Sequence, residues 1–368
     1  MISIIGAGPA GSYLAYLLAK KGENVNLYEE HSVVGSPIQC TGITTSSLKG
    51  ILDMDYDFVL NKAKYARIFS PNNNFIEIKL NKSNYVFDRD RFDRYIANLA
   101  VNEGAKLHLK SRYNGCSNNG KIKIKINNGF RETDILVGAD GPFSSVAKTN
   151  GMFNNRKFVY GIQARCNTKC DEEKIDFYLG YGCFGWVVPE NNKVARIGVA
   201  EYNNSTKDFE RLLKLRNATI INYQSGMIPV YNPNVITTKN NVYLIGDSAT
   251  QVKATTYGGI IQGLLAAKEM TKSFSDYDKN WRKAIGGDLL VGLYARKVMD
   301  KFNEKDYNEF VDLFSQDKLK KILEENDRDY IAKFAFKLFI KEPRLLKFLK
   351  YMFFIKLIHN FSSIKSNQ

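Results

Sequence analysis

The chain has 368 residues, of which 44% are hydrophobic and 25% are charged, a composition typical of a globular protein long enough for two or more domains. The formal net charge of +15 indicates an anionic partner: nucleic acid, an anionic membrane or a phosphorylated substrate. The five cysteines and three histidines form no metal-ligand pattern, and no apolar run approaches the roughly 18 residues of a membrane span, so the sequence favours neither a metalloprotein nor a transmembrane protein.

The first 30 residues have the order strand, glycine-rich turn, helix, strand. A strand at 2–5 leads into GAGPAG at 6–11, then into a helix ending near residue 20 and a second strand at 25–28. This is the context in which a G-x-G-x-x-G turn binds the pyrophosphate of a dinucleotide. With a strand beginning so early, we expect no signal peptide, and the odd number of cysteines suggests reduced thiols in the cytoplasm.

Each residue type in this turn has a physical reason. Gly6 permits the tight turn, Gly8 lets the backbone approach the pyrophosphate, and Gly11 lets the helix pack close to the sheet. The helix start offers unpaired N–H groups to the phosphates, and Ala10 lies in the same turn. Glu29, which ends the second strand, is placed to accept hydrogen bonds from the adenosine ribose.

Two later segments decide between NAD and FAD. Residues 134–141, DILVGADG, and 241–247, NVYLIGD, are buried strands that end in turns, and TYGGI at 256–260 opens an apolar helix. At the carboxyl end of its strand, Asp247 could accept hydrogen bonds from the ribityl chain of FAD. The helix start at Gly259 and Ile260 would stabilise a flavin ring that becomes anionic on reduction. An enzyme that binds only NAD does not need a second acidic strand end and a second glycine-rich helix start. The sequence therefore predicts FAD as the cofactor.

The three motifs in this order resemble the flavoprotein monooxygenase fold of the para-hydroxybenzoate hydroxylase type. The resemblance implies an α/β protein with a Rossmann-like FAD-binding domain, an antiparallel-sheet substrate domain and a helical C-terminal region. We expect the FAD domain to comprise 1–50, 81–150 and 236–275, the substrate domain 51–80 and 151–235, and the helical region 276–368. The resemblance also implies that an arginine in the segment YVFDRDRFD, 85–93, contacts the cofactor. Arg89 is the best match and Arg91 the alternative.

The stretch GCFGWVVPENNKVARIGVA, 182–200, predicts a hairpin that turns at 189–192 and places Trp186 toward the flavin or the core beneath it. Its Phe184-x-Trp186-x-x-Pro, followed after eight residues by Gly-Val-Ala, resembles the Y-x-W-x-F-P…G-x-G motif of geranylgeranyl reductases. Phe replaces Tyr and Ala replaces the last Gly. Flavin-dependent halogenases, with W-x-W-x-I-P, match less well because Phe184 is not a Trp.

These reductases also carry a cysteine in a glycine-rich loop against the flavin. Cys40, Thr41 and Gly42 occupy that position here, eleven to thirteen residues after Glu29. The resemblance therefore implies an FAD-dependent reductase of isoprenoid double bonds, acting on digeranylgeranylglycerophospholipids as the archaeal members do. Trp186 and Phe184 would form the apolar pocket, and Tyr257, Cys40 or a bound water would supply the proton.

The C-terminal segment 331–361 alternates basic residues with phenylalanine and leucine. Its basic residues recur at helical spacing and predict one basic helical face, formed by Lys333, Lys337, Lys341 and Arg344. Pro343 predicts the start of a second helix. The pattern is typical of a helix on an anionic membrane surface, with helices packed on the protein as the alternative. Membrane contact suits a prenylated lipid substrate and predicts a cytoplasmic protein peripheral to the membrane.

Three other functions are weighed. A hydroxylase would use oxygen and NAD(P)H, and a prenyl-binding chaperone of the GDP-dissociation-inhibitor type would use no flavin chemistry. The intact GAGPAG turn, Glu29 and Asp247 argue against the chaperone, and the absence of an RNP or zinc motif argues against a nucleic-acid partner.

The identity of the external reductant stays open between NAD(P)H and a ferredoxin-like electron donor protein. The sequence contains no set of cysteines that would hold an iron–sulfur cluster in the chain itself.

Overall fold

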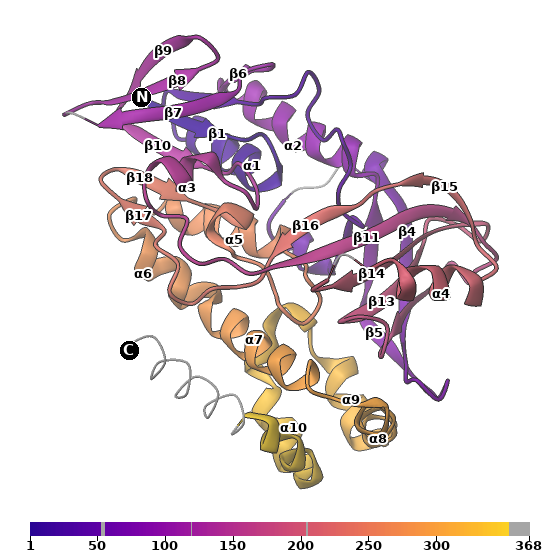
Figure 1. The fold of residues 1–368 in the computed structure, drawn as a ribbon. Helices are drawn as coiled ribbons and strands as arrows, with labels where there is room; N and C mark the ends of the chain where they lie inside the picture. Colours follow the sequence, from indigo (N-terminus) through magenta and orange to yellow (C-terminus); the bar gives the residue numbers. More distant parts are fainter. Residues whose placement is uncertain (53–55, 119, 204, 353–368) are drawn as a thin grey trace.

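The computed structural model describes residues 1–52, 56–118, 120–203 and 205–352, which form three β-sheets and a set of C-terminal helices (Figure 1). The six-stranded sheet has the order β17-β18-β10-β1-β2-β6, with β1, β2, β6, β10 and β18 parallel and β17 antiparallel at one edge. Its strands are β1 (Ile2–Ile5), β2 (Val25–Tyr28), β6 (Lys106–His108), β10 (Ile135–Gly138), β17 (Thr238–Lys239) and β18 (Val242–Leu244).

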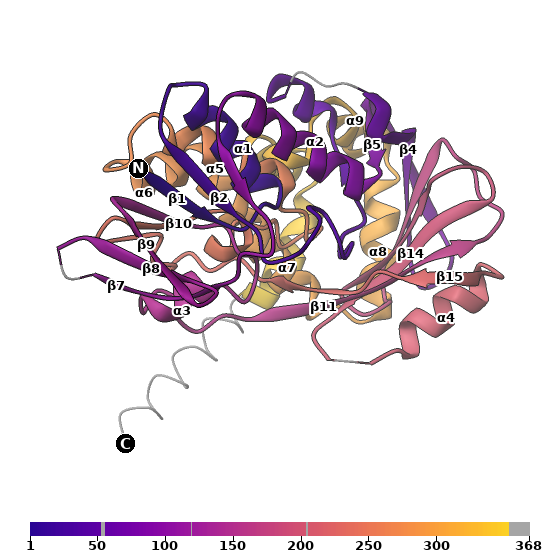
Figure 2. The ribbon, with the colours of Figure 1, turned by 90° about the horizontal axis from the view of Figure 1, so that it is seen from above.

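Both faces of the six-stranded sheet are covered, which is why its strands are apolar on both sides. Ile4 faces the core formed with the helices on one side, whereas Ile5 packs with the three-stranded sheet on the other. Figure 2 shows that sheet and α3 opposite α1 and α2. These elements are α1 (Pro9–Ala19), α2 (Arg89–Asn102), α5 (Ile260–Met270), β7 (Tyr113–Asn118), β8 (Ile122–Ile126), β9 (Gly129–Thr133) and α3 (Ser145–Thr149).

A second large sheet of nine strands lies beside the first, in the order β15-β11-β14-β13-β12-β4-β5-β3, with β16 also paired to β11. Every pair is antiparallel except β4 with β12, which is parallel. The strands are β3 (Ile43–Thr44), β4 (Val59–Phe69), β5 (Phe75–Phe87), β11 (Phe158–Asn167), β12 (Lys174–Tyr178), β13 (Phe184–Pro189), β14 (Val194–Glu201), β15 (Thr219–Tyr223) and β16 (Gly226–Pro229).

The predicted hairpin is confirmed as β13 and β14, in which Trp186 pairs with Gly198 and the turn lies between Pro189 and Val194. The short helices η1 (Ser46–Gly50) and η2 (Tyr56–Phe58) precede β4, α4 (Lys207–Leu215) follows β14, and η3 (Gly246–Ala249) follows β18. The predicted α/β class, with a Rossmann-like sheet, a largely antiparallel second sheet and a helical C-terminus, is therefore confirmed.

The C-terminal helices run from the first sheet across to β5 (Figure 1). Leu319 and Ile322 of α9 join the same apolar core as Ile76 and Ile78 of β5. The helices are α6 (Tyr277–Trp281), the π-helical turn η4 (Arg282–Gly286), α7 (Gly287–Met299), α8 (Glu304–Phe314), α9 (Asp317–Glu325), η5 (Arg328–Lys333), α10 (Ala335–Lys341) and η6 (Pro343–Leu349).

The expectation of one basic helical face at the C-terminus is wrong. The backbone leaves helical geometry at Phe334, with φ −127°, and at Glu342, with φ −141°, so Lys333, Lys337 and Arg344 belong to three different helices. The predicted helix start at Pro343 is confirmed. Residues 353–361 of the predicted basic segment lie outside the described residues. Among the described residues, no helix has the length and apolar character needed to cross a bilayer.

Candidate active site

The glycine turn after β1 has the close contacts expected of a dinucleotide-binding unit. Gly6 has φ +100°, and a Cβ there would lie 2.4 Å from the Ala139 carbonyl oxygen; at Gly11 it would lie 2.1 Å from the Gly6 oxygen. A Cβ at Gly8 would meet no protein atom within 4 Å, and no side chain caps α1. The turn is therefore closed on the protein side and open where phosphates would contact the helix start.

Glu29 lies directly beside this turn. Its Oε2 accepts a hydrogen bond from the Ala7 N–H at 2.9 Å, and its Oε1 lies 2.6 Å from His31 Nδ1. Oε1 also accepts from the His31 backbone N–H at 3.1 Å, so it is Oε2 that keeps a second lone pair for a hydroxyl group. Ala10 lies in the first turn of α1, and its methyl group packs 3.0 Å from the Cβ position of Gly246 and 3.1 Å from that of Gly263, where α1 meets η3 and α5. A contact of Ala10 with the cofactor stays a prediction.

Asp247 follows β18, at the carboxyl end of the parallel sheet. One of its oxygens lies 3.0 Å from the Cβ position of Gly259, immediately before Ile260 begins α5. No hydrogen bond to this carboxylate is found among the described residues. Burial raises its pKa to about 6, while the positive charge of Arg89 acts in the opposite direction. A carboxylate without a protein donor beside a helix start fits the polyol chain and ring of a flavin.

The loop after β2 and the start of α2 meet at the same place. Arg89 donates to Asp93 at 3.0 and 2.8 Å, and a Cβ on Gly42 would lie 2.8 Å from Arg89 Cγ. Burial lowers the pKa of Arg89, but Asp93 and then Cys40 outweigh this and raise it overall. The structure thus brings Arg89, Cys40, Gly42 and Asp247 together. Arg91 is 63% exposed on its side chain and pairs with Asp88 on the surface, away from this cluster.

An uncharged side chain that the sequence analysis missed joins this loop to the hairpin. Gln163 of β11 is buried, and its Oε1 accepts hydrogen bonds from Trp186 Nε1 at 2.9 Å and from Thr41 Oγ1 at 2.5 Å. Its Nε2 donates to Gln224 at 3.0 Å, so all of these polar groups are satisfied. The signal available in the sequence was a lone amide within the apolar strand YGIQARC.

Arg196 of β14 is a second residue that was missed. It is buried, pairs through Nε with Glu190 at 2.8 Å, and donates through Nη1 to the Thr41 carbonyl oxygen at 2.5 Å and that of Phe87 at 2.9 Å. A buried guanidinium with these partners links β14 to the end of β5, to the Thr41 loop and to the turn after β13. It holds the Cys40–Gly42 loop against the second sheet.

Trp186 and Phe184 form one continuous aromatic wall with Tyr257. The Phe184 ring stacks on Tyr257 with centroids 5.9 Å apart and planes 9° apart, and lies 5.6 Å from the Trp186 ring. All three side chains are more than nine-tenths buried. Tyr257 has φ +51°, an uncommon conformation for an aromatic residue that directs its ring back toward the hairpin. The predicted pocket residues on β13 and before α5 are therefore adjacent.

A chain of oxygens leads from this wall to the surface. Tyr257 Oη lies 3.5 Å from Tyr202 Oη, and Tyr202 donates to Asp300 at 2.8 Å. Burial raises the pKa of Tyr257 well above its usual range and also raises the pKa of Asp300. Tyr202 and Asp300 line a surface cavity of about 520 Å³ between the hairpin and α8. Neither residue was singled out from the sequence.

The comparisons with known proteins agree with this geometry. The NAD(P)-binding Rossmann-like domain family matches residues 4–51. Among solved structures, a geranylgeranyl bacteriochlorophyll reductase-like protein from Thermoplasma acidophilum has a TM-score of 0.80, with 23% identity over 95% of this chain and 98% of that one. A flavin-dependent brominase has a TM-score of 0.67, with 16% identity over 93% and 99%. The fold is that of flavin-dependent oxidoreductases built on a Rossmann-like unit.

Proteins similar in sequence indicate which flavin-dependent oxidoreductases this chain resembles. A digeranylgeranylglycerophospholipid reductase of Methanococcus vannielii is 27% identical over 95% of this chain and 97% of its own length. That of Methanosarcina acetivorans is 28% identical over 84% and 87%. The chain is a relative of the geranylgeranyl reductases, as the hairpin motif predicted.

Proposed function

We propose that this protein is an FAD-dependent reductase that saturates the isoprenoid double bonds of a digeranylgeranylglycerophospholipid. One observation carries the proposal: Trp186, Phe184 and Tyr257 form a buried apolar wall that Gln163 ties to the Thr41 loop beside Asp247 and Arg89. An apolar wall beside a flavin site suits a substrate without polar groups near the reacting carbons. The full-length similarity to prenyl lipid reductases supports the same substrate class.

The residues described above would hold FAD. The turn at Gly6, Gly8 and Gly11 would receive the pyrophosphate, Glu29 the adenosine ribose, and Asp247 the ribityl hydroxyls. Cys40, Thr41 and Gly42 would border the ring, with Arg89 behind them and the α5 start at Gly259 and Ile260 facing it. When bound and reduced by NAD(P)H or an electron donor protein, FAD would supply the hydride for one alkene carbon.

The protein residues would position the alkene and provide the proton. Trp186 and Phe184 hold the prenyl chain and exclude water. The Tyr257 hydroxyl, whose pKa burial raises, stays protonated and donates its proton to the second alkene carbon. Tyr202 then returns a proton to Tyr257, and Asp300, which faces the surface cavity, takes up a proton from water and passes it to Tyr202. Cys40 is the alternative donor.

Membrane contact is part of the proposal. Phe336 and Ile340 lie one helical turn apart on α10 and are 76% and 61% exposed, and Leu346 of η6 is 50% exposed. Large apolar side chains at this exposure, beside Lys333, Lys337 and Lys341, fit the interface of an anionic membrane. We place the protein in the cytoplasm, peripheral to that membrane, where its lipid substrate resides.

The deciding experiment is anaerobic. The purified protein is saturated with FAD, reduced with dithionite and mixed with a geranylgeranylated glycerophospholipid in detergent. We expect reoxidation of the flavin and a gain of two mass units per double bond. A protein that takes up no FAD would support the chaperone function instead. A reduced flavin that the lipid does not reoxidise, in a protein that consumes oxygen with an aromatic substrate, would support a hydroxylase.

A further inference from the structure

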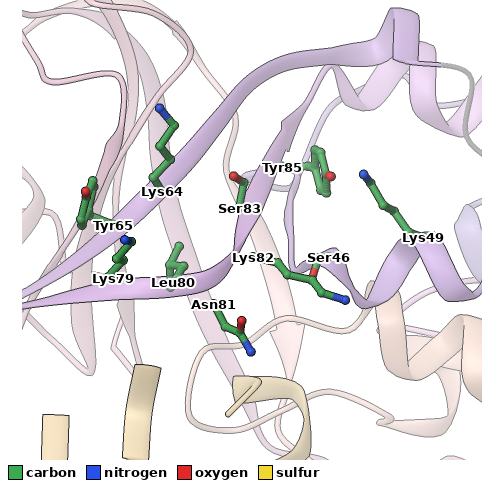
Figure 3. A pocket seen from close by; sticks show the side chains of 10 residues that line it. All are labelled: Ser46, Lys49, Lys64, Tyr65, Lys79, Leu80, Asn81, Lys82, Ser83 and Tyr85. Carbon is green, nitrogen blue, oxygen red and sulfur yellow. The ribbon is translucent and has the colours of Figure 1, made fainter. Parts of the chain in front are cut away.

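The surface cavities show which polar groups approach the aromatic wall. One cavity, of about 420 Å³, is lined by residues of η1, β4 and β5 and includes no residue of the wall (Figure 3). The cavity that contains Tyr202 and Asp300 also has Cys183 in its lining, and Cys183 directly precedes Phe184. This second cavity is therefore the one that connects solvent with the wall.

A buried positive charge lies against the wall at the same place. Arg296 of α7 is 1% exposed, and its guanidinium carbon lies 5.9 Å from the centroid of the Phe184 ring. The same ring stacks on Tyr257, with centroids 5.9 Å apart. Phe184 thus contacts both a guanidinium group and the phenol that is the proposed proton donor. The proton path described above gives Arg296 no role.

The guanidinium group has few partners for a buried charge. Its Nη1 donates to the Cys183 carbonyl oxygen at 2.6 Å, and its Nη2 lies 3.2 Å from the Met299 sulfur. Its Nε is buried and has no hydrogen-bond partner among the residues that the structure describes. The carboxylate of Asp300 lies 3.5 Å from Nη1. A buried charge that is compensated so weakly destabilises a fold, so its place beside the wall favours a function.

Arg296 is a neighbour of both ends of the chain of oxygens. The chain runs from Tyr257 through Tyr202 to Asp300, with separations of 3.5 and 2.8 Å. Asp300 follows Arg296 by one turn of α7 and pairs with it, while Phe184 contacts both Arg296 and Tyr257. These five side chains form a closed cluster around the proposed proton path, with one positive charge in it.

The charge of Arg296 favours the ionised form at both ends of this path. Burial raises the pKa of Tyr257, and Cys183 and Tyr202 raise it further, whereas Arg296 lowers it. Burial also raises the pKa of Asp300, and Arg296 again acts in the opposite direction. Burial lowers the pKa of Arg296 itself, but Tyr257 and then Asp300 outweigh this, so the guanidinium keeps its charge.

Proton transfer to an alkene leaves a negative charge in the wall. The O–H bond of Tyr257 breaks, a C–H bond forms on the substrate, and the electron pair stays on the phenolic oxygen. The other alkene carbon takes the hydride of the proposed reaction. A phenolate in a buried apolar site is costly unless a positive charge is close. Reprotonation through Tyr202, with a proton that Asp300 takes from water, restores the neutral phenol.

We infer that Arg296 is a positioning residue for this step: its charge stabilises the Tyr257 phenolate while the alkene is protonated. The inference rests on the proposed function for the identity of the proton acceptor. The structural alternative is that Arg296 only ties α7 to β13, through its bond to the Cys183 carbonyl oxygen.

The test measures the ionisation of this phenol directly and needs no substrate. 3,5-Difluorotyrosine, which is more acidic than tyrosine, replaces Tyr257 in the oxidised, FAD-saturated protein, and its fluorine NMR signal is followed with pH. An opposite charge nearby shifts a pKa by about 1–3 units. We expect Arg296→Met to raise the pKa of the phenol by at least about one unit, and Arg296→Lys, which keeps the charge, to raise it by less than about half as much.

Two further variants control for structural effects. Arg282→Met removes another arginine that donates to backbone carbonyl oxygens, those of Pro233 and Val235, and should leave the pKa of the phenol unchanged. Asp300→Asn removes the negative partner of Arg296 and leaves the guanidinium in place, so the pKa of the phenol should fall. This variant tests the inference even if Arg296→Met does not fold.

Each outcome decides between the inference and its alternatives. Equal pKa values with and without the Arg296 charge would leave Arg296 a structural residue and overturn the inference. An equal rise in Arg282→Met, or a phenol that stays neutral up to about pH 11 with Arg296 intact, would also overturn it. A protein that reduces the lipid but shows no shift sinks the inference alone. The expected shift in a protein that reduces no prenyl lipid sinks the proposed function alone.

Discussion

The indole ring of Trp186 lies flat across Gly198 of the neighbouring strand. The two residues are paired in register, and a Cβ on Gly198 would come within 2.3 Å of Trp186 Cζ2. No side chain fits there unless the indole moves. Gly198, which matches the first glycine of the G-x-G pattern of geranylgeranyl reductases, is therefore the steric partner of Trp186 in this chain. Ala200, where the family has its second glycine, pairs with Phe184 and is tolerated as alanine.

The first prediction concerns this contact. Gly198→Ala would push the indole out of the wall, and the resulting overpacking should lower the free energy of unfolding by roughly 1–3 kcal/mol. Reduction of the prenyl chain should fall further than stability explains, because Trp186 no longer faces the alkene. Urea unfolding and the anaerobic flavin assay measure the two effects. Ala200→Gly is the matched control and should keep its activity; equal loss in both variants would refute the steric role of Gly198.

The second prediction concerns Gln163. Gln163→Leu leaves the buried Trp186 N–H without an acceptor, at a cost of about 1–3 kcal/mol, and also removes the acceptor of the half-buried Thr41 hydroxyl. In a Trp186→Phe background one of these donors is already gone, so Gln163→Leu should cost less there. A double-mutant cycle by urea unfolding measures the coupling. If the two substitutions are additive, Gln163 does not organise the wall.

A local sequence pattern was enough to predict some parts of the site. The turn at 6–11, the strand ending at Glu29 and the β13–β14 hairpin each follow from short-range spacing, and all are present. Gln163, Arg196, Tyr202 and Asp300 could not be found in this way. Their partners lie between 55 and 155 residues away, apart from nearer pairings such as Gln163 with Trp186 and Arg196 with Glu190. Tertiary contacts, among them the pairing of β11 with β14, bring these residues together.

The C-terminal prediction failed for a related reason. Spacings of four, four and three among the basic residues describe one helical face only if the helix is continuous. The chain leaves helical geometry at Phe334, which is buried in the core, and at Glu342, which is tied to Lys318 and Arg344. Tertiary packing decided where the helices end, and no local pattern reports such packing.

The third prediction is a pH dependence of the apoprotein. Burial raises the pKa of Asp247 to about 6, against the charge of Arg89, so the folded protein holds this proton more tightly than the unfolded chain. The carboxyl group thus stabilises the fold at low pH, and that contribution, at most about 3 kcal/mol, is lost as the pH rises from 4 through 6. Asp247→Asn should flatten this part of the stability profile measured by urea unfolding.

Asp134 provides the control for that profile. Its carboxylate pairs with the N-terminal ammonium group at 2.7 Å, which lowers its pKa, so its contribution has the opposite sign and is lost as the pH falls. Asp134→Asn should leave the decline between pH 4 and 6 in place. FAD binding should also tighten as Asp247 ionises, and an affinity independent of pH would contradict its assignment to the ribityl chain.

The fourth prediction concerns proton supply. Tyr257→Phe removes the hydroxyl without removing the ring that stacks on Phe184, so the lipid should bind as before while reoxidation of the flavin slows by about 100-fold or more. Tyr202→Phe interrupts the path to Asp300 and should slow repeated turnovers more than the first. Stopped-flow spectroscopy separates these phases. Cys40→Ser is the comparison: a larger defect there than in Tyr257→Phe would make Cys40 the donor.

The fifth prediction concerns the apolar surface of α10 and the charges beside it. Phe336→Ser/Ile340→Ser removes exposed apolar area, so the free energy of unfolding should barely change, whereas binding to anionic vesicles should fall severalfold because the apolar contribution scales with buried area. Co-sedimentation with phosphatidylglycerol vesicles measures this, and salt should weaken the remaining binding. Phe130→Ser removes a 57% exposed ring on β9, at the other end of the molecule. If that control loses binding equally, or if the α10 variant loses none, the membrane surface lies elsewhere.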